Sequence, residues 1–118
     1  MKDMEALLHT VVEASEERKA ENSVVLNLQG LNSIADYFVI CHGNNERQVQ
    51  AIARSIMDEV EKAGFTVRRV EGFEQARWIL IDLGDIICHV FHKDERSYYN
   101  LERLWGDAEE VSIGDDSR

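Results

Sequence analysis

The fold is decided by residues 78–91, WILIDLGDIICHVF, which have the pattern of a β-hairpin. Gly84-Asp85 is a two-residue turn of the Gly-X kind that favours type II′ hairpins. The register then decides which side chains share a face of the sheet, because a slip of one residue would exchange the two faces. We predict the cross-strand pairs 83 with 86, 82 with 87, 81 with 88, 80 with 89, 79 with 90 and 78 with 91.

This register divides the hairpin into two faces of different composition, because side chains alternate along a strand. One face is wholly apolar and is predicted to be core: Ile79, Ile81, Leu83, Ile86, Cys88 and Val90. The other face mixes aromatic, aliphatic and polar side chains: Trp78, Leu80, Asp82, Ile87, His89 and Phe91. We predict that this mixed face is exposed and binds a partner, because aromatic anchors within a polar rim are typical of protein interfaces. The alternative is that the last helix covers it, since such sheets are often covered on both sides.

The rest of the chain predicts helices and further strands around the hairpin. Apolar residues recur at helical spacing in two long segments, and the second has Asn44 or Asn45 as a candidate N-cap and Gly64 at its C′ position. Strand, helix and strand over residues 37–71 form a βαβ unit whose two strands should be parallel. We predict helices over residues 3–19, from the cap at Asn44 or Asn45 through the apolar positions that end at Ala63, and from Asp94 onward. We predict strands over residues 24–28, 37–42 and 65–71.

These elements predict one α/β (α+β) domain. Its mixed sheet has about five strands flanked by helices. We place the domain at residues 1–108 and interpret residues 109–118 as an acidic, disordered tail.

Composition excludes several classes of function. The chain has 118 residues and a formal net charge of −10, so its field repels nucleic acid and attracts basic partners. It contains no apolar run near the ~20 residues that span a bilayer and no signal-peptide pattern at its N-terminus. Its two cysteines, Cys41 and Cys88, lie in strand-like apolar runs and indicate buried thiols in a reducing cytosol. We therefore expect a cytoplasmic protein without a membrane segment or a direct nucleic-acid site.

Two repeated dipeptides, Cys41-His42 and Cys88-His89, raise the question of zinc. Neighbouring strand residues point to opposite faces, so each dipeptide offers only one ligand to a given face. Two ligands are too few for a structural zinc site, and we predict no metal. His89 alone could act as a general base, but its same-face neighbours form a flat patch without converging acids.

Two further patterns could carry phosphate chemistry. Asp36, Asp82 and Asp85 are candidate magnesium ligands for nucleotidyl transfer, but Asp82 and Asp85 straddle the turn instead of lying two apart on one strand. Asp85 is also a residue that the hairpin turn favours. Gly43-Asn44-Asn45, at a strand-to-helix junction, could hold an anion, although helix capping is the simpler interpretation. We predict no catalytic residue and no cofactor.

Several segments resemble the ribosomal silencing factor S family, also called Iojap-related proteins. The resemblance covers the chain from Met4 to Val111. Asn27 departs from the family, which commonly has aspartate there, so any role of that carboxylate is in doubt in this chain. The segments that carry the resemblance are Ala35–Ile40, Glu71-Gly72, Trp78–Phe91 and Arg96–Trp105.

The resemblance implies a nucleotidyltransferase-like fold without the catalytic acids. It also implies a non-enzymatic function: binding to ribosomal protein number fourteen of the large subunit, which blocks joining of the small subunit. The result would be repression of translation under nutrient limitation. A homodimer is implied for the chain when it is not on the ribosome.

The face assignments provide candidate residues for that binding. Asp82 and Glu102 are candidates for ion pairs with lysine or arginine of the partner. The full set of predicted partner-binding residues is Trp78, Leu80, Asp82, Ile87, His89, Phe91, Tyr98, Tyr99 and Glu102. Two alternatives stay open at this point: a large-subunit assembly or maturation factor, and a magnesium-dependent nucleotidyltransferase.

Overall fold

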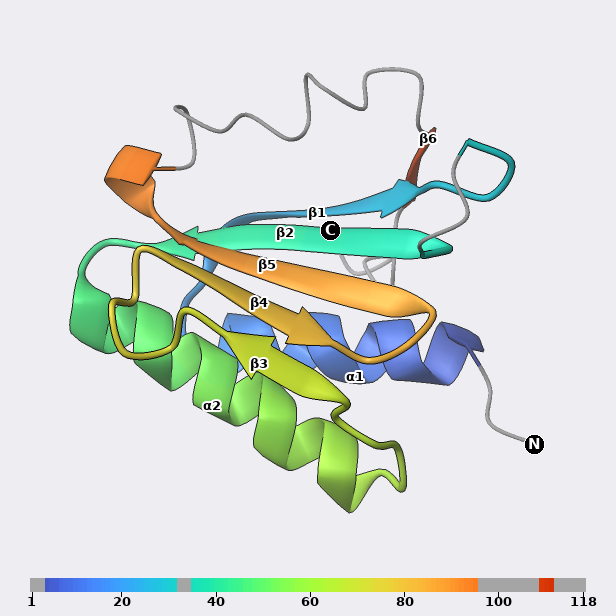
Figure 1. The fold of residues 1–118 in the computed structure, drawn as a ribbon, viewed down its shortest axis with the longest axis horizontal. Coiled ribbons are helices and arrows are strands. Elements are labelled where there is room, and N and C mark those ends of the chain that lie inside the picture. Colours follow the sequence, from blue (N-terminus) through green and yellow to red (C-terminus); the bar gives the residue numbers. More distant parts are fainter. Residues whose placement is uncertain (1–3, 32–34, 96–108, 112–118) are drawn as a thin grey trace.

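The described residues form one mixed sheet, and the first two helices of the chain pack on the same side of it (Figure 1). The computed structural model describes residues 4–31, 35–95 and 109–111. The strand order is β3-β4-β5-β2-β1-β6, so the prediction of a single domain with a mixed sheet is confirmed, with six strands instead of about five. The elements are α1 (Met4–Glu17), β1 (Glu21–Asn27), β2 (Tyr37–Gly43), α2 (Glu46–Lys62), β3 (Arg69–Glu71), β4 (Trp78–Asp82), β5 (Ile86–His92) and β6 (Glu109–Val111).

The hairpin of β4 and β5 has the predicted register. Trp78 pairs with Phe91, Leu80 with His89, and Asp82 with Ile87. Gly84 has φ +98°, the left-handed region that a type II′ turn requires at its first central position. The Gly-Asp turn therefore fixes the register as its chemistry predicts.

The apolar face of the hairpin is the core of the domain. Ile79, Ile81, Ile86, Cys88 and Val90 are all 0% exposed, and they pack with apolar side chains of both helices. α1 and α2 each turn their apolar positions toward this face, including Val11 of α1 and Ile52 of α2. The assignment of this face to the core is confirmed.

The βαβ unit is also present, with an unexpected spacing between its strands. β2 is parallel to β5, β5 is antiparallel to β4, and β4 is antiparallel to β3, so β2 and β3 run in the same direction. Two strands lie between them, because the hairpin strands β4 and β5 fill the interior of the sheet. The parallel orientation was predicted correctly, and the separation was not predicted.

β3 is shorter than the predicted strand at residues 65–71, and the first of those residues, Phe65, closes the end of α2. Gly64 takes φ +91°, and the N–H of Phe65 donates to the carbonyl of Val60 at 3.0 Å, which closes the helix end. Only Arg69–Glu71 then pair with β4. The predicted capping role of Gly64 is confirmed.

β6 begins inside the segment that we interpreted as a disordered tail. Glu109–Val111 pair antiparallel with β1, so the sheet extends past the predicted domain boundary at residue 108. The remainder of that segment, residues 112–118, lies outside the described residues, as does most of the predicted last helix. Within the described part of the chain, no helix has the length and apolarity needed to cross a membrane.

Candidate functional site

The candidate site is the sheet face opposite the helices, which we call the outer face. It consists of the side chains of β4 and β5 that the hairpin register directs away from α1 and α2, together with their neighbours on β1 and β2. Among the described residues, no side chain of α1 or α2 belongs to this apolar cluster. Its members are Leu26, Leu28, Ala35, Phe38, Ile40, Ile87 and Phe91, with Val24, Trp78 and Leu80 packed against them.

The outer face is not uniformly exposed, which corrects the prediction that it is open throughout. Ile87, His89 and Phe91 on β5 are only 7%, 4% and 0% exposed, whereas Trp78, Leu80 and Asp82 on β4 are half-buried. β5 is interior to the sheet, so large side chains from both neighbouring strands close over it. The Trp78 ring stacks on Phe91 with centroids 5.2 Å apart, and the Phe38 ring on β2 meets His89 edge-on at 4.5 Å. Of the six hairpin residues predicted to bind, only the three on β4 offer accessible surface.

His89 and Trp78 form a hydrogen-bonded pair across the hairpin. The indole Nε1–H of Trp78 donates to Nδ1 of His89 at 3.0 Å. Burial lowers the pKa of His89 to about 4, so the imidazole is neutral at physiological pH. Since Nδ1 accepts, the single proton of the neutral ring lies on Nε2, and this atom has no hydrogen-bond partner among the described residues. A buried donor without a partner costs about 1–3 kcal/mol.

This environment argues against His89 as a general base. Its ring is buried, its Nδ1 is already occupied by Trp78, and no carboxylate accepts its Nε2–H within the described structure. The prediction of an exposed face is therefore wrong at His89, because Phe38 and Trp78 pack against its ring and leave it 4% exposed.

Asp82 has a structural role in addition to its position on the outer face. Its Oδ1 accepts the N–H of Gly84 at 2.9 Å, which stabilises the hairpin turn. Its Oδ2 lies 3.9 Å from Nη2 of Arg69, on the neighbouring strand β3. Oδ1 of Asp82 is therefore used by the turn, whereas Oδ2 faces a cationic side chain, that of Arg69.

The acidic residues considered for magnesium do not form a cluster of three. Among the described residues, no group of three or more histidine, cysteine or carboxylate side chains is arranged to hold a metal ion. The backbone explains the proximity of two of the aspartates, because the N–H of Asp36 donates to the carbonyl of Asp85 at 2.8 Å. Cys88 lies in the helix-side core and His89 on the outer face, as the alternation of a strand predicts, and burial raises the pKa of the Cys88 thiol.

The junction at Gly43-Asn44-Asn45 is a helix cap. Oδ1 of Asn45 accepts the N–H of Gln48 at 2.8 Å, and Oε1 of Gln48 accepts the N–H of Asn44 at 2.7 Å. These reciprocal bonds occupy donors that an anion would need. The capping interpretation is confirmed.

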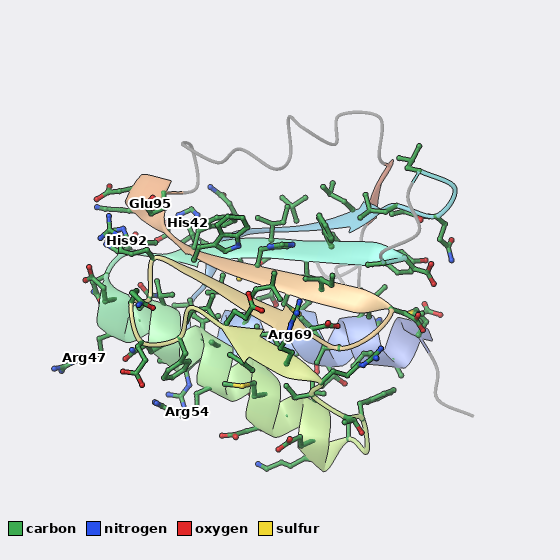
Figure 2. The ribbon with its side chains drawn as sticks, in the orientation of Figure 1. His42, Arg47, Arg54, Arg69, His92 and Glu95 are labelled. Atoms are coloured by element: carbon green, nitrogen blue, oxygen red, sulfur yellow. The ribbon has the colours of Figure 1, made fainter. Side chains whose placement is uncertain are left out.

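A charged cluster near this junction was missed by the sequence analysis. Arg77, just before β4, donates from Nη1 to Glu46 of α2 at 3.0 Å and from Nη2 to Glu95 at 2.8 Å. A backbone hydrogen bond and Arg77 lower the pKa of Glu46. Figure 2 shows Glu95 and His92 at the end of the sheet where α2 begins, with His42 nearby. No local motif could reveal this cluster, since its members are far apart in the sequence.

Three predicted binding residues, Tyr98, Tyr99 and Glu102, lie outside the described residues. Their assignment to the site stays a prediction.

The chain is similar to known proteins along almost its whole length. A family model described as "Ribosomal silencing factor during starvation" matches residues 1–118. The chain is 57% identical over 107 residues to a ribosomal silencing factor RsfS of Halalkalibacterium halodurans, covering 91% of this chain and 92% of the relative. It is 53% identical over 106 residues to the RsfS of Bacillus subtilis, covering 90% of each chain. It is 30% identical over 109 residues to the chloroplastic protein Iojap of Zea mays, covering 92% of this chain and 47% of that protein.

Solved structures show the same fold. A crystal structure of a protein from Bacillus halodurans has a TM-score of 0.82 and 52% identity, covering 92% of this chain and 98% of that chain. A crystal structure of a protein from Chromobacterium violaceum has a TM-score of 0.87 and 30% identity, covering 96% of this chain and 93% of that chain. The protein belongs to the ribosomal silencing factor family, RsfS.

Proposed function

We propose that this protein silences ribosomes by binding the large subunit through the β4 part of its outer face. The observation that carries the proposal is the row of half-buried side chains Trp78, Leu80 and Asp82, supported by the buried aromatic layer of β5. Such a row combines a rigid aromatic anchor, an aliphatic contact and a carboxylate, the composition expected for an interface centre with a polar rim. The family to which the chain belongs indicates that the partner is the ribosome.

The proposed partner on the large subunit is ribosomal protein number fourteen. A protein with a net charge of −10 is attracted to basic proteins and repelled by RNA, so a basic ribosomal protein is the more favourable contact. Asp82 supports this choice because its Oδ2 already lies 3.9 Å from a guanidinium nitrogen of Arg69 and its side chain is 23% exposed.

The proposed mechanism is steric and needs no catalysis. An interface of standard size, about 1,200–2,000 Å², holds a small domain in place. If the bound domain overlaps the surface needed by the small subunit, binding and subunit joining exclude one another. Translation is then repressed, and we place this activity in the cytoplasm under nutrient limitation.

The experiment is a subunit-joining assay with a matched pair of variants. Isolated subunits are mixed at a magnesium concentration that permits joining, and light scattering reports the joined particles. We expect the wild-type protein to reduce the signal and Trp78→Ala to lose this effect. Met57→Ala is the control, because Met57 is also half-buried but packs on the helix-side core. Equal inhibition by both variants would contradict the proposed docking face.

We further propose that the unbound protein is a homodimer that pairs partly through the outer face. An exposed apolar patch on a protein in solution favours association, and a second copy of the chain can bury this patch. The molar mass from light scattering after size exclusion tests this proposal. Wild type should be dimeric and Trp78→Ala should shift toward monomer, whereas an unchanged dimer would separate the dimer interface from the outer face.

A further inference from the structure

The chemistry at position 89 is not explained by packing alone. His89 is 4% exposed in an environment of aromatic and aliphatic side chains, where an apolar residue would fill the same space without cost. The imidazole instead leaves its Nε2–H without a partner among the described residues. A feature that weakens the fold needs a compensating role, and the one polar contact that His89 makes in the described structure is with Trp78.

That contact constrains the indole in two ways. The hydrogen bond from Nε1–H to Nδ1, at 3.0 Å, sets the rotation of the ring about its side-chain bonds. Trp78 also stacks on Phe91 with 27° between the ring planes, so the Phe91 ring packs against one face of the indole. Trp78 is half-buried, so part of this residue is accessible and its indole is held in one orientation by these two contacts.

We propose that His89 is a positioning residue, which holds the Trp78 indole so that a partner contacts its carbon surface and not its N–H. The inference rests on the proposed function and adds how the anchor is recognised. A partner that needed the indole N–H would first have to break an existing bond. The group that docks on Trp78 is therefore one that contacts a ring face or edge, such as an aliphatic or cationic side chain.

Pre-organisation predicts a specific energetic result. When His89 no longer accepts, the indole gains rotational freedom that binding must remove, and affinity falls about 2- to 10-fold. His89→Phe removes the acceptor while keeping an aromatic ring. His89→Asn is the matched variant, because its Oδ1 is placed near the former Nδ1 and can still accept from the indole.

The test combines a spectroscopic and a binding measurement. The indole ¹H–¹⁵N resonance of Trp78, assigned with Trp78→Phe, should exchange slowly with solvent in wild type and His89→Asn and faster in His89→Phe. Binding to isolated large subunits should weaken about 2- to 10-fold in His89→Phe and less in His89→Asn. In a Trp78→Phe background, His89→Phe should have no further effect on affinity, because the bond is already absent. Thermal melting confirms that each variant is folded.

The outcomes separate this inference from the proposed function. If wild type binds large subunits and His89→Phe binds equally well, the positioning role is wrong while the proposed function stands. Equal indole exchange in wild type and His89→Phe would also overturn the positioning role, independently of the ribosome. If wild type does not bind large subunits, the proposed function fails and the inference fails with it.

Discussion

The two faces of the β4–β5 hairpin differ in how strongly composition determines burial. On the helix side, all six predicted residues are apolar and at most 8% exposed. On the outer face, the three residues of β5 are buried and the three of β4 are half-buried. Strand alternation therefore predicts which face a side chain joins, whereas its exposure depends on the position of its strand in the sheet. The proposed binding surface is the outer face of β4, where the side chains are of mixed composition and the strand lies next to the edge strand β3.

The largest expected effect is on the helix side. Ile81 is 0% exposed, so Ile81→Ala should lower the free energy of unfolding by about 2–5 kcal/mol through lost burial and a cavity. Chemical denaturation measures this loss. A cost below about 1 kcal/mol would mean that this face is not the tightly packed core.

The buried histidine of the outer face gives the next effect, as a dependence on pH. Burial lowers the pKa of His89 from 6.5, its value in an unfolded chain, to about 4 in the folded protein. Between these two pH values, only the unfolded chain takes up a proton. Stability should therefore fall as pH decreases from about 6.5 to about 4, by about 3 kcal/mol in total from this group.

Urea denaturation of wild type and His89→Phe at several pH values isolates this contribution, because the carboxylates titrate in both proteins. As pH falls, the free energy of unfolding of wild type should decrease more than that of His89→Phe. A difference that is constant from pH 7 to pH 4 would show that His89 is accessible to protons, against the buried environment described above.

A smaller effect distinguishes the two faces of β4. Leu80 is half-buried, so Leu80→Ala should cost about 1 kcal/mol of stability and also weaken binding to large subunits by about 1 kcal/mol, or roughly fivefold. Ile81→Ala, measured under conditions in which it remains folded, should bind large subunits with the affinity of wild type. If Leu80→Ala reduced stability alone, the β4 surface would be core and not interface.

The smallest effect is expected for the ion pairs at the end of the sheet. The Arg77 side chain is 41% exposed, and its partners Glu46 and Glu95 are 54% and 24% exposed, so solvent screens the cluster. Arg77→Ala should lower stability only slightly, less than any of the changes above, with a smaller loss in 1 M salt. Arg47→Ala is the control, because Arg47 is an exposed residue of α2 that forms no ion pair with the other described residues. Equal effects of the two changes would show that the cluster contributes nothing specific.

Local sequence chemistry determined much of the fold. The Gly84-Asp85 turn fixed the hairpin register, and Asn45 and Gly64 marked the ends of α2. What could not be predicted depends on contacts between distant segments. Phe38 encloses His89 only because β2 lies beside β5, and Arg77 meets Glu46 only because α2 begins near the start of β4. The neutral, partly unsatisfied state of His89 follows from that three-dimensional enclosure.

Hydroxyl-radical footprinting of the protein with and without isolated large subunits tests the central claim most directly. Trp78 and Met57 are both half-buried, both react with hydroxyl radicals, and lie on opposite sides of the sheet, so one molecule contains the probe and its control. We predict that large subunits reduce oxidation of Trp78 and leave Met57 unchanged. Protection of Met57 with no change at Trp78 would contradict the assignment of the outer face as the ribosome-binding surface.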